Sequence, residues 1–428
     1  MIASILSIVV FLATLILIFT ERVNRVIASL VGAVVMVAIG LIFGFYNESL
    51  ALESIDFNTI GLLLGMMIIV AVLEPTGFFQ YLAILVSKRS NGKPLKLLFL
   101  LGTITTVVSM FLDNVTTVVL IAPVTILICE ILGLNPLPYL MSEAILSNTG
   151  GMATLIGDPP NILIGSAAGF SFIDFLTHSL PIVVFLWFVA LLILRILFRK
   201  ELLESPSNLD ALEELNPKVA LKDARAAKKV IIVVGITVVF FLLEEMLHIR
   251  PALVGLGASA LALIWVQPSI QDTLKRVHWD VLVFFGALFV LIGGLEATGV
   301  MRSLVELIAH AKNMPPVVFG LILLWGVAIL SALVDNVPIT IALIPVIQGL
   351  GAAGMDINPL WWALVFGAGL GGNGTIIGST ANIVVTSVSD KTETPITPKI
   401  WNKYGLPVML GTCLVASVLY LIFFYLVY

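Results

Sequence analysis

The stretch Leu73-Glu74-Pro75-Thr76-Gly77 returns later in the chain, with one change, as Leu295-Glu296-Ala297-Thr298-Gly299. The two copies are 222 residues apart (295 minus 73), and the same displacement brings Asp113-Asn114-Val115 onto Asp335-Asn336-Val337. Further matches follow at a displacement of 221 (375 minus 154). Several blocks in one register indicate that the chain consists of two copies of one unit.

The composition of the 428-residue chain places both copies in a membrane. Hydrophobic residues make up 60% and charged residues 11%, and the mean hydropathy of +1.13 is too high for a water-soluble globule. The apolar stretches can cross about 30 Å of hydrocarbon as helices, and no ten-residue alternation suggests a barrel. We therefore predict an all-α polytopic membrane protein. The net charge of −4, with the basic residues in short loops, does not indicate a nucleic-acid partner.

The two repeats are predicted to span 1–199 and 229–428, joined by a polar linker at 200–228. In the first repeat we expect five full crossings and, at 95–133, a re-entrant hairpin that enters and leaves on one side. The full crossings are expected near 2–20, 24–45, 58–74, 138–169 and 178–198. Because five is odd, the second repeat must lie inverted relative to the first, as in many secondary transporters.

The distribution of Lys and Arg predicts the orientation, because short cytoplasmic loops carry an excess of these residues. Of the 22 basic residues, all but Arg250, Arg302 and Lys312 fall on one side of the predicted topology. We assign that side, with the linker, to the cytoplasm. Both termini are then predicted to be external, and we expect the protein in the plasma (inner) membrane.

Each predicted hairpin is interrupted at its tip by an aspartate, Asp113 in the first repeat and Asp335 in the second. A carboxylate at the centre of a bilayer costs about 2.5–3.5 kcal/mol on insertion scales, so it is a functional candidate. Each Asp also precedes a good helix start and can cap that helix. Capping and proton carriage are compatible, since a helix N-terminus inside the membrane also favours polar or anionic ligands.

A second pair of breaks lies at 147–161 and 369–382, where Gly, Asn, Ser and Thr, with Pro159-Pro160 in the first, interrupt the apolar sequence. Irregular backbone at membrane depth must be buried in protein or line a cavity, so we expect all four breaks to converge at the midplane. Glycines let the backbone approach a ligand, while amides and hydroxyls donate and accept hydrogen bonds. Close helix packing is the alternative explanation for Gly150 and Gly151.

Other polar residues give weaker indications. Glu74 and Glu296 recur in both repeats at helix ends, where an interfacial and a gating role are both open. Glu143 has no acidic counterpart, since Leu364 stands at its position in the second repeat, and it is either a stop on a proton path or a residue near the interface. Cys129, Cys413 and the four histidines form no cluster with metal-ligand spacing, so no metal is predicted.

At its breaks the sequence resembles the ion transporter superfamily, specifically the arsenite permease (ArsB-type) and P-protein branch. The resemblance rests on the stretches 112–117, 156–162 and 371–375, and it covers essentially the whole chain. In sodium-coupled anion symporters of this superfamily the hairpin tips carry Ser-Asn-Thr. Asp113 and Asp335 stand where those serines would be, which argues against a multiply charged anion and favours proton coupling or a cation.

The resemblance also implies a division into two parts. A scaffold, at 1–90 and 229–312, would hold the protein in place and form a homodimer. A mobile transport part, at 95–199 and 315–428, would carry the substrate across the bilayer as an elevator.

The leading hypothesis is a secondary transporter, not an enzyme, that exports the neutral trihydroxides of arsenite and antimonite in exchange for protons. The residues expected to bind the substrate are Asn114, Thr116, Asn148, Thr149, Gly151, Thr154, Asn161, Asn336, Asn373, Thr375 and Asn382. The residues expected to carry protons or ions are Asp113, Asp335 and Asp158, although the participation of Asp158 is open because its counterpart is Ser379. No cofactor is expected.

Three alternatives are kept. A sodium/proton antiporter would use the two tip carboxylates for a hard cation, and an anion or organic-acid transporter would use the helix N-termini. An intramembrane aspartyl protease is disfavoured by the inverted repeat and by the missing Gly-x-Gly-Asp pattern. The chain has no Gly-x-x-x-x-Gly-Lys-Ser/Thr loop for ATP. A separate soluble ATPase partner is still possible.

Overall fold

The computed structural model describes residues 2–20, 23–300 and 314–426, and the regular elements in this part of the chain are helices. The first repeat contains α1 (Ile2–Phe19), α2 (Arg25–Phe43), α3 (Glu48–Glu53), α4 (Phe57–Leu73), η1 (Glu74–Thr76), α5 (Phe78–Ser90), α6 (Pro94–Ser109), α7 (Asn114–Leu132), α8 (Leu137–Gly151), α9 (Pro159–Ala168), α10 (Phe172–Asp174), the π-helical turn η2 (Phe175–Ser179) and α11 (Leu180–Leu197).

The linker forms three short helical segments before the second repeat begins. They are η3 (Glu201–Leu203), α12 (Leu209–Glu214) and α13 (Pro217–Ala220). The second repeat contains α14 (Ala224–Leu242), α15 (Glu244–Leu247), α16 (Pro251–Val266), α17 (Ile270–Lys275), α18 (Trp279–Ala297), α20 (Pro316–Leu333), α21 (Asn336–Ala352), α22 (Asn358–Gly371), α23 (Thr380–Ser389) and α24 (Pro398–Leu426).

The predicted all-helical architecture is confirmed. Among the described residues, eight helices are long and apolar enough to cross a bilayer by themselves. Two re-entrant hairpins, α6–α7 and α20–α21, turn at Asp113 and Asp335, and two broken helices, α8–α9 and α22–α23, are interrupted where Gly and Pro were expected to break them. Arg22, Arg302 and Lys312, used for the topology, lie outside the described residues.

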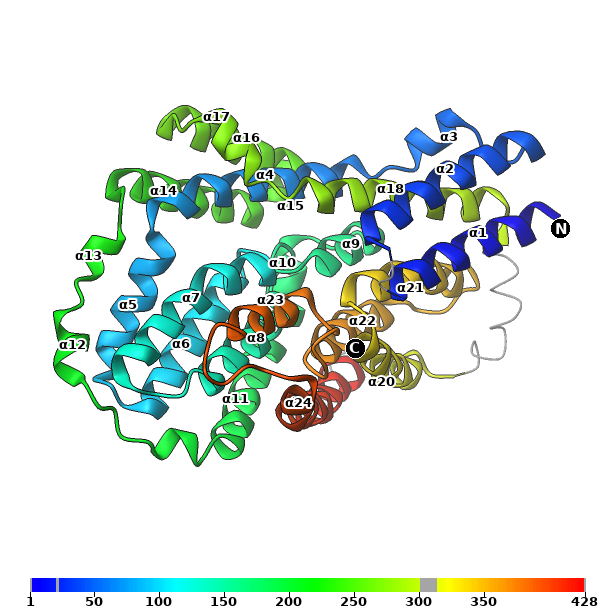
Figure 1. Cartoon of the computed structure of the whole chain (residues 1–428). Helices are drawn as coiled ribbons and strands as arrows, with labels where there is room; N and C mark the ends of the chain where they lie inside the picture. Colours follow the sequence, from blue (N-terminus) through cyan, green and yellow to red (C-terminus); the bar gives the residue numbers. More distant parts are fainter. Residues whose placement is uncertain (1, 21–22, 301–313, 427–428) are drawn as a thin grey trace.

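The helices form two layers (Figure 1). The scaffold layer, α1–α4 and α14–α18, runs along one side of the molecule, and the hairpin layer, α6–α11 and α20–α24, packs against it. Within the scaffold layer the repeats interlock, because α4 packs on α16 and its counterpart α18 packs on α2. A Cβ at Gly65 would lie 2.3 Å from the backbone carbon of Gly255. Small residues at this crossing therefore let the backbones of α4 and α16 touch.

Equivalent hydrogen bonds occur at equivalent positions in the two halves of the hairpin layer. Ser109 Oγ donates to the Ser147 carbonyl (2.7 Å), and its counterpart Ser331 Oγ donates to the Ala368 carbonyl (2.8 Å). Each serine thus ties the first helix of a hairpin to a broken helix. Equivalent bonds in the two halves satisfy backbone groups that water cannot reach at this depth.

The two breaks are closed by equivalent asparagines. Asn161 Nδ2 donates to the carbonyls of Gly151 (2.9 Å) and Thr154 (2.8 Å). Its counterpart Asn382 Nδ2 donates to the carbonyls of Gly372 (2.7 Å) and Thr375 (2.8 Å). The carbonyls that the broken helices leave free therefore accept side-chain hydrogen bonds. These bonds lower the free-energy cost of interrupting a helix inside a membrane.

Helix α5 packs with the hairpin layer, although its residues were assigned from the sequence to the scaffold part. Gly77 turns the chain in a left-handed conformation (φ 77°) at the end of η1. From there α5 buries Ala83 and Ile84 in the cluster formed by the hairpin layer, and it contacts α6 and α7. Helix α5 therefore leads from one layer to the other (Figure 1).

Helix α14 begins before residue 229, the predicted start of the second repeat, because Asp223 caps it. The Asp223 carboxylate accepts a hydrogen bond from the Ala226 N–H (2.9 Å). This cap satisfies one of the free donors at the helix start.

Close packing of the broken helices on the hairpins depends on two equivalent glycines. A Cβ at Gly150 would lie 2.5 Å from the Thr106 carbonyl oxygen, and one at Gly371 would lie 2.4 Å from that of Ala328. We expect Gly150→Ala and Gly371→Ala each to destabilise the fold by about 1–3 kcal/mol, since backbone must shift to make room. The check is the melting temperature in detergent. Gly326→Ala is the control, because no atom lies within 4 Å of its Cβ position. An unchanged melting temperature in both test variants would contradict this packing.

Candidate functional site

A cavity of about 310 Å³ lies between the two layers, where both hairpin tips and both helix breaks meet. Its lining residues are Arg25, Leu63, Met66, Met67, Val70, Phe111, Leu112, Asp113, Asn114, Val115, Ile156, Asp158, Pro159, Ile162, His278, Asp280, Val281, Phe284, Phe285, Asp335, Asn336, Val337, Ser379 and Thr380. The cavity is large enough for a small solute with some water, and it reaches toward the end of the interface marked by His278 and Asp280.

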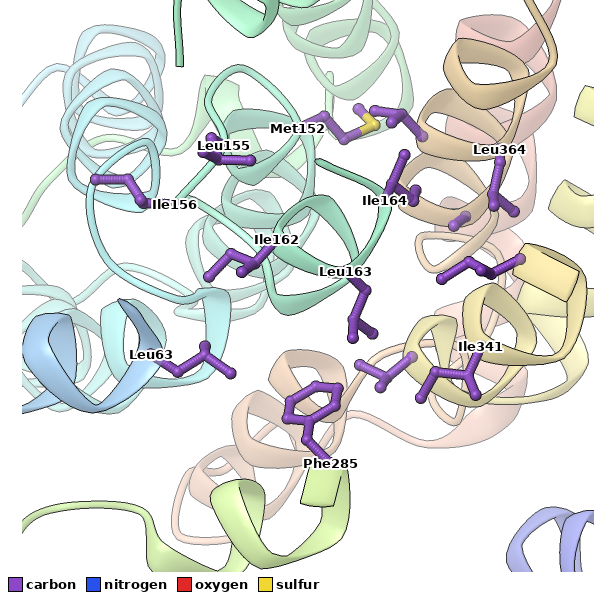
Figure 2. Packing of buried hydrophobic residues seen from close by; sticks show 14 of the residues in the cluster. Leu63, Met152, Leu155, Ile156, Ile162, Leu163, Ile164, Phe285, Ile341 and Leu364 are labelled. Carbon is purple, nitrogen blue, oxygen red and sulfur yellow. The ribbon is translucent and has the colours of Figure 1, made fainter. Parts of the chain in front are cut away.

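The two walls of this cavity differ in chemistry. The hairpin layer contributes most of the polar groups, and the scaffold layer contributes mainly the apolar side chains of α4 and α18, such as Leu63 and Phe285. Figure 2 shows Leu63 and Phe285 approaching Ile162 and Leu163 of α9. The polar groups of the cavity are therefore carried mainly by one layer and covered by the other.

Asp158 lies at the centre of the polar wall. Its Oδ2 accepts hydrogen bonds from Asn114 Nδ2 and from Asn336 Nδ2, each at 3.0 Å. Asn114 opens α7 at the first hairpin tip, and Asn336 opens α21 at the second. With the side chain only 3% exposed, these two amides replace much of the solvation that burial removes. One carboxylate thus joins both hairpins.

This arrangement breaks the symmetry of the repeats. The counterpart of Asp158 is Ser379, whose Oγ donates to Asn148 Oδ1 (2.9 Å). Because Ser379 stands at this position in the second repeat, Asn336 finds no carboxylate there. It donates instead to Asp158 of the first repeat. The site has one buried carboxylate between two equivalent asparagines, rather than two equivalent half-sites.

Asp113 and Asp335, the two tip aspartates, are N-caps. Asp113 accepts from the Thr116 N–H (2.9 Å) and Thr116 Oγ1 (2.5 Å). Asp335 accepts from the Val337 N–H (3.0 Å) and also from Thr380 Oγ1 (2.7 Å). Both line the cavity while they cap, so capping does not remove them from the site, and their predicted role as proton or ion carriers stays a prediction.

Arg25 forms an ion pair with only one of the two tip aspartates, Asp335. Its Nη1 lies 3.6 Å from Asp335 Oδ2 and donates to Thr380 Oγ1 at 3.4 Å. The guanidinium also lies over the Phe284 ring, 5.6 Å from its centroid. Among the described residues, Asp113 has no such ion pair.

Four helices begin at this cavity, with Asp113, Asp158, Asp335 and Ser379 as the N-caps of α7, α9, α21 and α23. Each N-terminus carries about half a positive charge. Together with Arg25 they largely offset the three carboxylates. The helix dipoles therefore make a triply acidic site tolerable inside the membrane.

The other predicted site residues lie behind the cavity wall. Asn148 Nδ2 donates to Asn373 Oδ1 (3.0 Å) and Asn382 Oδ1 (3.1 Å), which ties the two broken helices together. The hydroxyls of Thr149, Thr154 and Thr375 donate to backbone carbonyls of Ile145, Met110 and Ala332. These residues, with Thr116, Gly151 and Asn161, do not line the cavity of the present conformation. Their predicted contact with substrate stays a prediction.

Several lining residues were not among the predicted site residues. Ser379 and Thr380 lie in a break that the sequence did single out. Arg25 was assigned only to a cytoplasmic loop, and the apolar wall of α4 and α18 carries no local signal that separates it from other membrane helix. Only the packing of the layers reveals these groups.

The remaining acidic candidates lie away from the polar wall. Glu143 is fully buried among α7 and α8, where Thr125 Oγ1 donates to its Oε1 (2.5 Å). Glu74 pairs with Arg276 at 2.8 Å, and Glu296 lines a different cavity. In the described part of the chain, no group of three or more His, Cys, Asp or Glu side chains could hold a metal ion.

At the other end of the interface, Glu244 connects the layers outside the membrane-spanning helices. Its Oε1 accepts from the Phe172 N–H (2.8 Å), and Phe172 stacks on Phe241. Burial raises the pKa of the Glu244 carboxyl to about 7. The Phe172 hydrogen bond opposes this rise, while the Glu245 and Asp174 carboxylates add to the pKa.

Comparison with known proteins shows the family of the chain. A family model described as citrate transporter (CitMHS) matches residues 15–367. The 46 kDa membrane protein of Mycobacterium leprae is 38% identical over 421 residues, which is 97% of each chain. The human P protein is 31% identical over 93% of this chain and 57% of its own length.

A solved structure has the same fold. The YdaH transporter of Alcanivorax borkumensis superposes with a TM-score of 0.63 over 100% of this chain and 99% of its own, at 17% identity. At that identity the likeness concerns the fold.

The two amides on Asp158 yield a stability prediction. We expect Asn114→Ala and Asn336→Ala each to cost about 1.5–3 kcal/mol, the range for hydrogen bonds to charged groups. Each loss should shrink when Asp158→Asn is already present, because the carboxylate that needs the donor is gone. Melting temperatures of single and double variants measure this coupling, with the exposed Asn402→Ala as control. Strictly additive losses would contradict a shared interaction at Asp158.

A pH dependence follows from Glu244. Because its pKa is raised in the folded state, its ionised form disfavours folding. The stability of this contact is full below the ordinary value of 4.5 and is lost as the pH rises to about 7. Glu244→Gln mimics the protonated form, so we expect it to match the native protein at about pH 4 and to melt higher at about pH 8. The neighbouring Glu245→Gln should show no such crossover. An equal difference at both pH values would contradict the assignment.

Proposed function

We propose that this chain, which belongs to the citrate transporter (CitMHS) family of the ion transporter superfamily, exports a small, uncharged, hydroxylated solute in exchange for protons. The leading candidates are the trihydroxides of arsenite and antimonite, by resemblance to the arsenite permease and P-protein branch. The supporting observation is Asp158, a single buried carboxylate that both hairpin tips hold at the cavity wall.

Asp158 supports an exchange mechanism. As a carboxylate it is a hydrogen-bond acceptor, so it suits a solute that donates several O–H groups. When protonated it loses its charge, one oxygen becomes an O–H donor, and the group is a weaker acceptor for the solute. Solute and proton therefore compete for the same oxygen atoms, and either one reduces the cost of a bare carboxylate in the membrane, about 2.5–3.5 kcal/mol. If the site crosses the membrane only when Asp158 holds either a solute molecule or a proton, solute export is coupled to proton entry.

The charge of the site disfavours citrate itself as the substrate. Four carboxylates line the cavity, those of Asp113, Asp158, Asp280 and Asp335, and Arg25 is the one arginine or lysine among its lining residues. Two like charges 4 Å apart repel by about 4 kcal/mol at an effective dielectric constant near 20. A trivalent anion would meet this repulsion several times over, so a neutral solute fits better.

The two-layer architecture supports an elevator mechanism. The hairpin layer carries the polar groups, and the scaffold wall that it faces is mostly apolar. The hairpin layer can therefore slide by breaking a few hydrogen bonds between the layers, such as those of Arg25 with Thr380 and of Phe172 with Glu244, rather than an extended network. On the topology predicted from charge, the cavity reaches toward the cytoplasm, because His278 follows Lys275 and Arg276. The present conformation is then inward-facing. Assembly as a homodimer and use of a soluble ATPase partner are part of the same proposal.

Two alternatives each have one observation in their favour. The carboxylates of Asp113, Asp158 and Asp335, with the hydroxyls of Ser379 and Thr380, would also suit Na⁺, and the protein would then be a sodium/proton antiporter. The convergence of four helix N-termini with Arg25 would suit an organic anion. Both are separated from the leading proposal by the substrate dependence of proton flux.

The test is proton flux in proteoliposomes that carry the purified protein and an imposed pH gradient. We expect arsenite or antimonite to dissipate the gradient. Asp158→Asn should reduce this flux at least about tenfold, because a charge-assisted hydrogen bond is worth about 1.5–3 kcal/mol. Asp113→Asn and Asp335→Asn test the tip carboxylates in the same assay, and Asp272→Asn, an exposed aspartate paired with Lys275, is the matched control.

The outcomes distinguish the candidates. A response to sodium without a response to metalloid would sink the leading proposal in favour of the antiporter. A response only to carboxylic acids would favour the anion transporter. Full activity of Asp158→Asn would remove the proposed coupling residue, whatever the substrate.

A further inference from the structure

A second cavity, of about 180 Å³, lies at the opposite end of the layer interface. It is lined from the scaffold layer by Ser54, Asp56 and residues of α18, and from the hairpin layer by residues of α9 and α21. The main cavity does not include this space, although Phe285 lines both. Phe285 and Leu163, which lines only the second cavity, lie close together in Figure 2.

The scaffold walls of the two cavities are symmetry counterparts. The main cavity uses four residues of α4, and the second cavity uses the four residues of α18 that lie 222 positions later. The pairs are Leu63 and Phe285, Met66 and Leu288, Met67 and Phe289, and Val70 and Ile292. Because of the inverted repeat, the scaffold layer has an equivalent apolar wall at the other end of the interface.

The charged partner of the hairpin tip also has a counterpart. Arg25 is the first residue of α2, and Arg250 is the N-cap of α16, the corresponding helix of the second repeat. The two arginines are 225 residues apart (250 minus 25), so Arg250 lies three positions after Leu247, the residue at the displacement of 222, and the correspondence is one of helix start rather than of exact register. Arg25 of the first repeat pairs with Asp335 of the second. The reciprocal pair would join Arg250 of the second repeat to Asp113 of the first (335 minus 222).

In the present conformation both members of that reciprocal pair are available. Arg250 is exposed. Among the described residues, neither Arg250 nor Asp113 forms an ion pair. Arg250 lines a third cavity with Gly165 and Ser166, near the C-terminal end of α9. The N-terminal end of α9, beside Asp113, lies seven residues away (166 minus 159), or about 10 Å at 1.5 Å per residue.

We infer that the second cavity is the access route to the site from the other side, and that Arg250 binds Asp113 there as Arg25 binds Asp335 here. The inference rests on the elevator part of the proposed function. A displacement of the hairpin layer by roughly 10 Å would exchange one ion pair for the other. Each end state then has one tip carboxylate neutralised by a scaffold arginine. The two arginines act as opposing latches that set the balance between inward-facing and outward-facing states.

The counterpart is not identical in every detail, which makes the two latches unequal. Thr380 accepts a hydrogen bond from Arg25, but the corresponding residue in the first repeat is Pro159, which has no such acceptor in its side chain. Phe284, under the Arg25 guanidinium, corresponds to Leu62, which offers no aromatic face. The Arg25 latch should therefore be the stronger one, in agreement with the state that is observed.

Thiol accessibility in the full-length protein tests this inference without knowledge of the substrate. Ile292→Cys, on the second cavity, and Val70→Cys, its counterpart on the main cavity, would each be labelled with a membrane-impermeant reagent. The background would be Cys129→Ala and Cys413→Ala. We expect Arg25→Gln to increase labelling at 292 severalfold and to decrease it at 70, because it releases the present state. Arg250→Gln should shift both in the opposite direction. Arg25→Lys and Arg250→Lys, which keep the charge, should shift the labelling less.

A cross-link gives an independent check of the pair. Arg250→Cys with Asp113→Cys should be joined by a short bifunctional thiol reagent, and the product should be fixed with position 292 accessible. Arg250→Cys with Asp335→Cys is the control and should not react. The inference is overturned if both arginine substitutions shift labelling in the same direction, or if the 113–250 pair never cross-links while the equivalent 25–335 pair does. Labelling that shifts as expected without any metalloid-dependent proton flux would retain the latches and remove the proposed substrate.

Discussion

Asp158 Oδ2 accepts hydrogen bonds from two asparagines that belong to different repeats and different hairpins, and the site depends on this junction. A buried carboxylate is costly unless donors surround it. Here the donors are the first residues of α7 and α21, so solvating the carboxylate also fixes both hairpin tips in place. The polar groups of the cavity wall are therefore held in place by the same bonds that hold the layer together.

The hydrogen-bond pattern behind this junction is nearly two-fold symmetric. Ser109 and Ser331, Asn161 and Asn382, and Thr154 and Thr375 make equivalent bonds to backbone carbonyls in the two halves. Symmetry is suitable for structural bonds, since each half faces the same need to satisfy an interrupted helix in a membrane. It is lost at Asp158 and Ser379, where a single titratable group is placed against a neutral one.

The contrast between the two walls supports the elevator movement proposed above. Side chains of the hairpin layer hold one another, while the scaffold layer mainly presents Leu, Met, Val and Phe. Apolar contact is non-directional, so it can be exchanged for an equivalent contact after a shift along the interface. The residues that follow on α18 are of the same kind. Few directional bonds between layers have to break, and the Arg25–Asp335 pair is one of them.

The sequence by itself determined the membrane environment, the helical class, the inverted repeat and the position of all four breaks. These features are local: apolar length, Gly and Pro interruptions and a repeated register all remain visible along one chain. It also indicated Asp113, Asn114, Asp158, Asp335 and Asn336, because polar residues at such breaks cannot be accounted for as lipid-facing helix.

Only the tertiary structure decided which of these groups meet. Nothing local shows that Asn336 serves Asp158 of the other repeat, that Arg25 pairs with an aspartate 310 positions away (335 minus 25), or that Asn148 holds Asn373 instead of lining the cavity. Two similar repeats offer each side chain two equivalent sets of neighbours. The choice between them depends on how the layers pack, which is a property of the whole fold and not of any one segment.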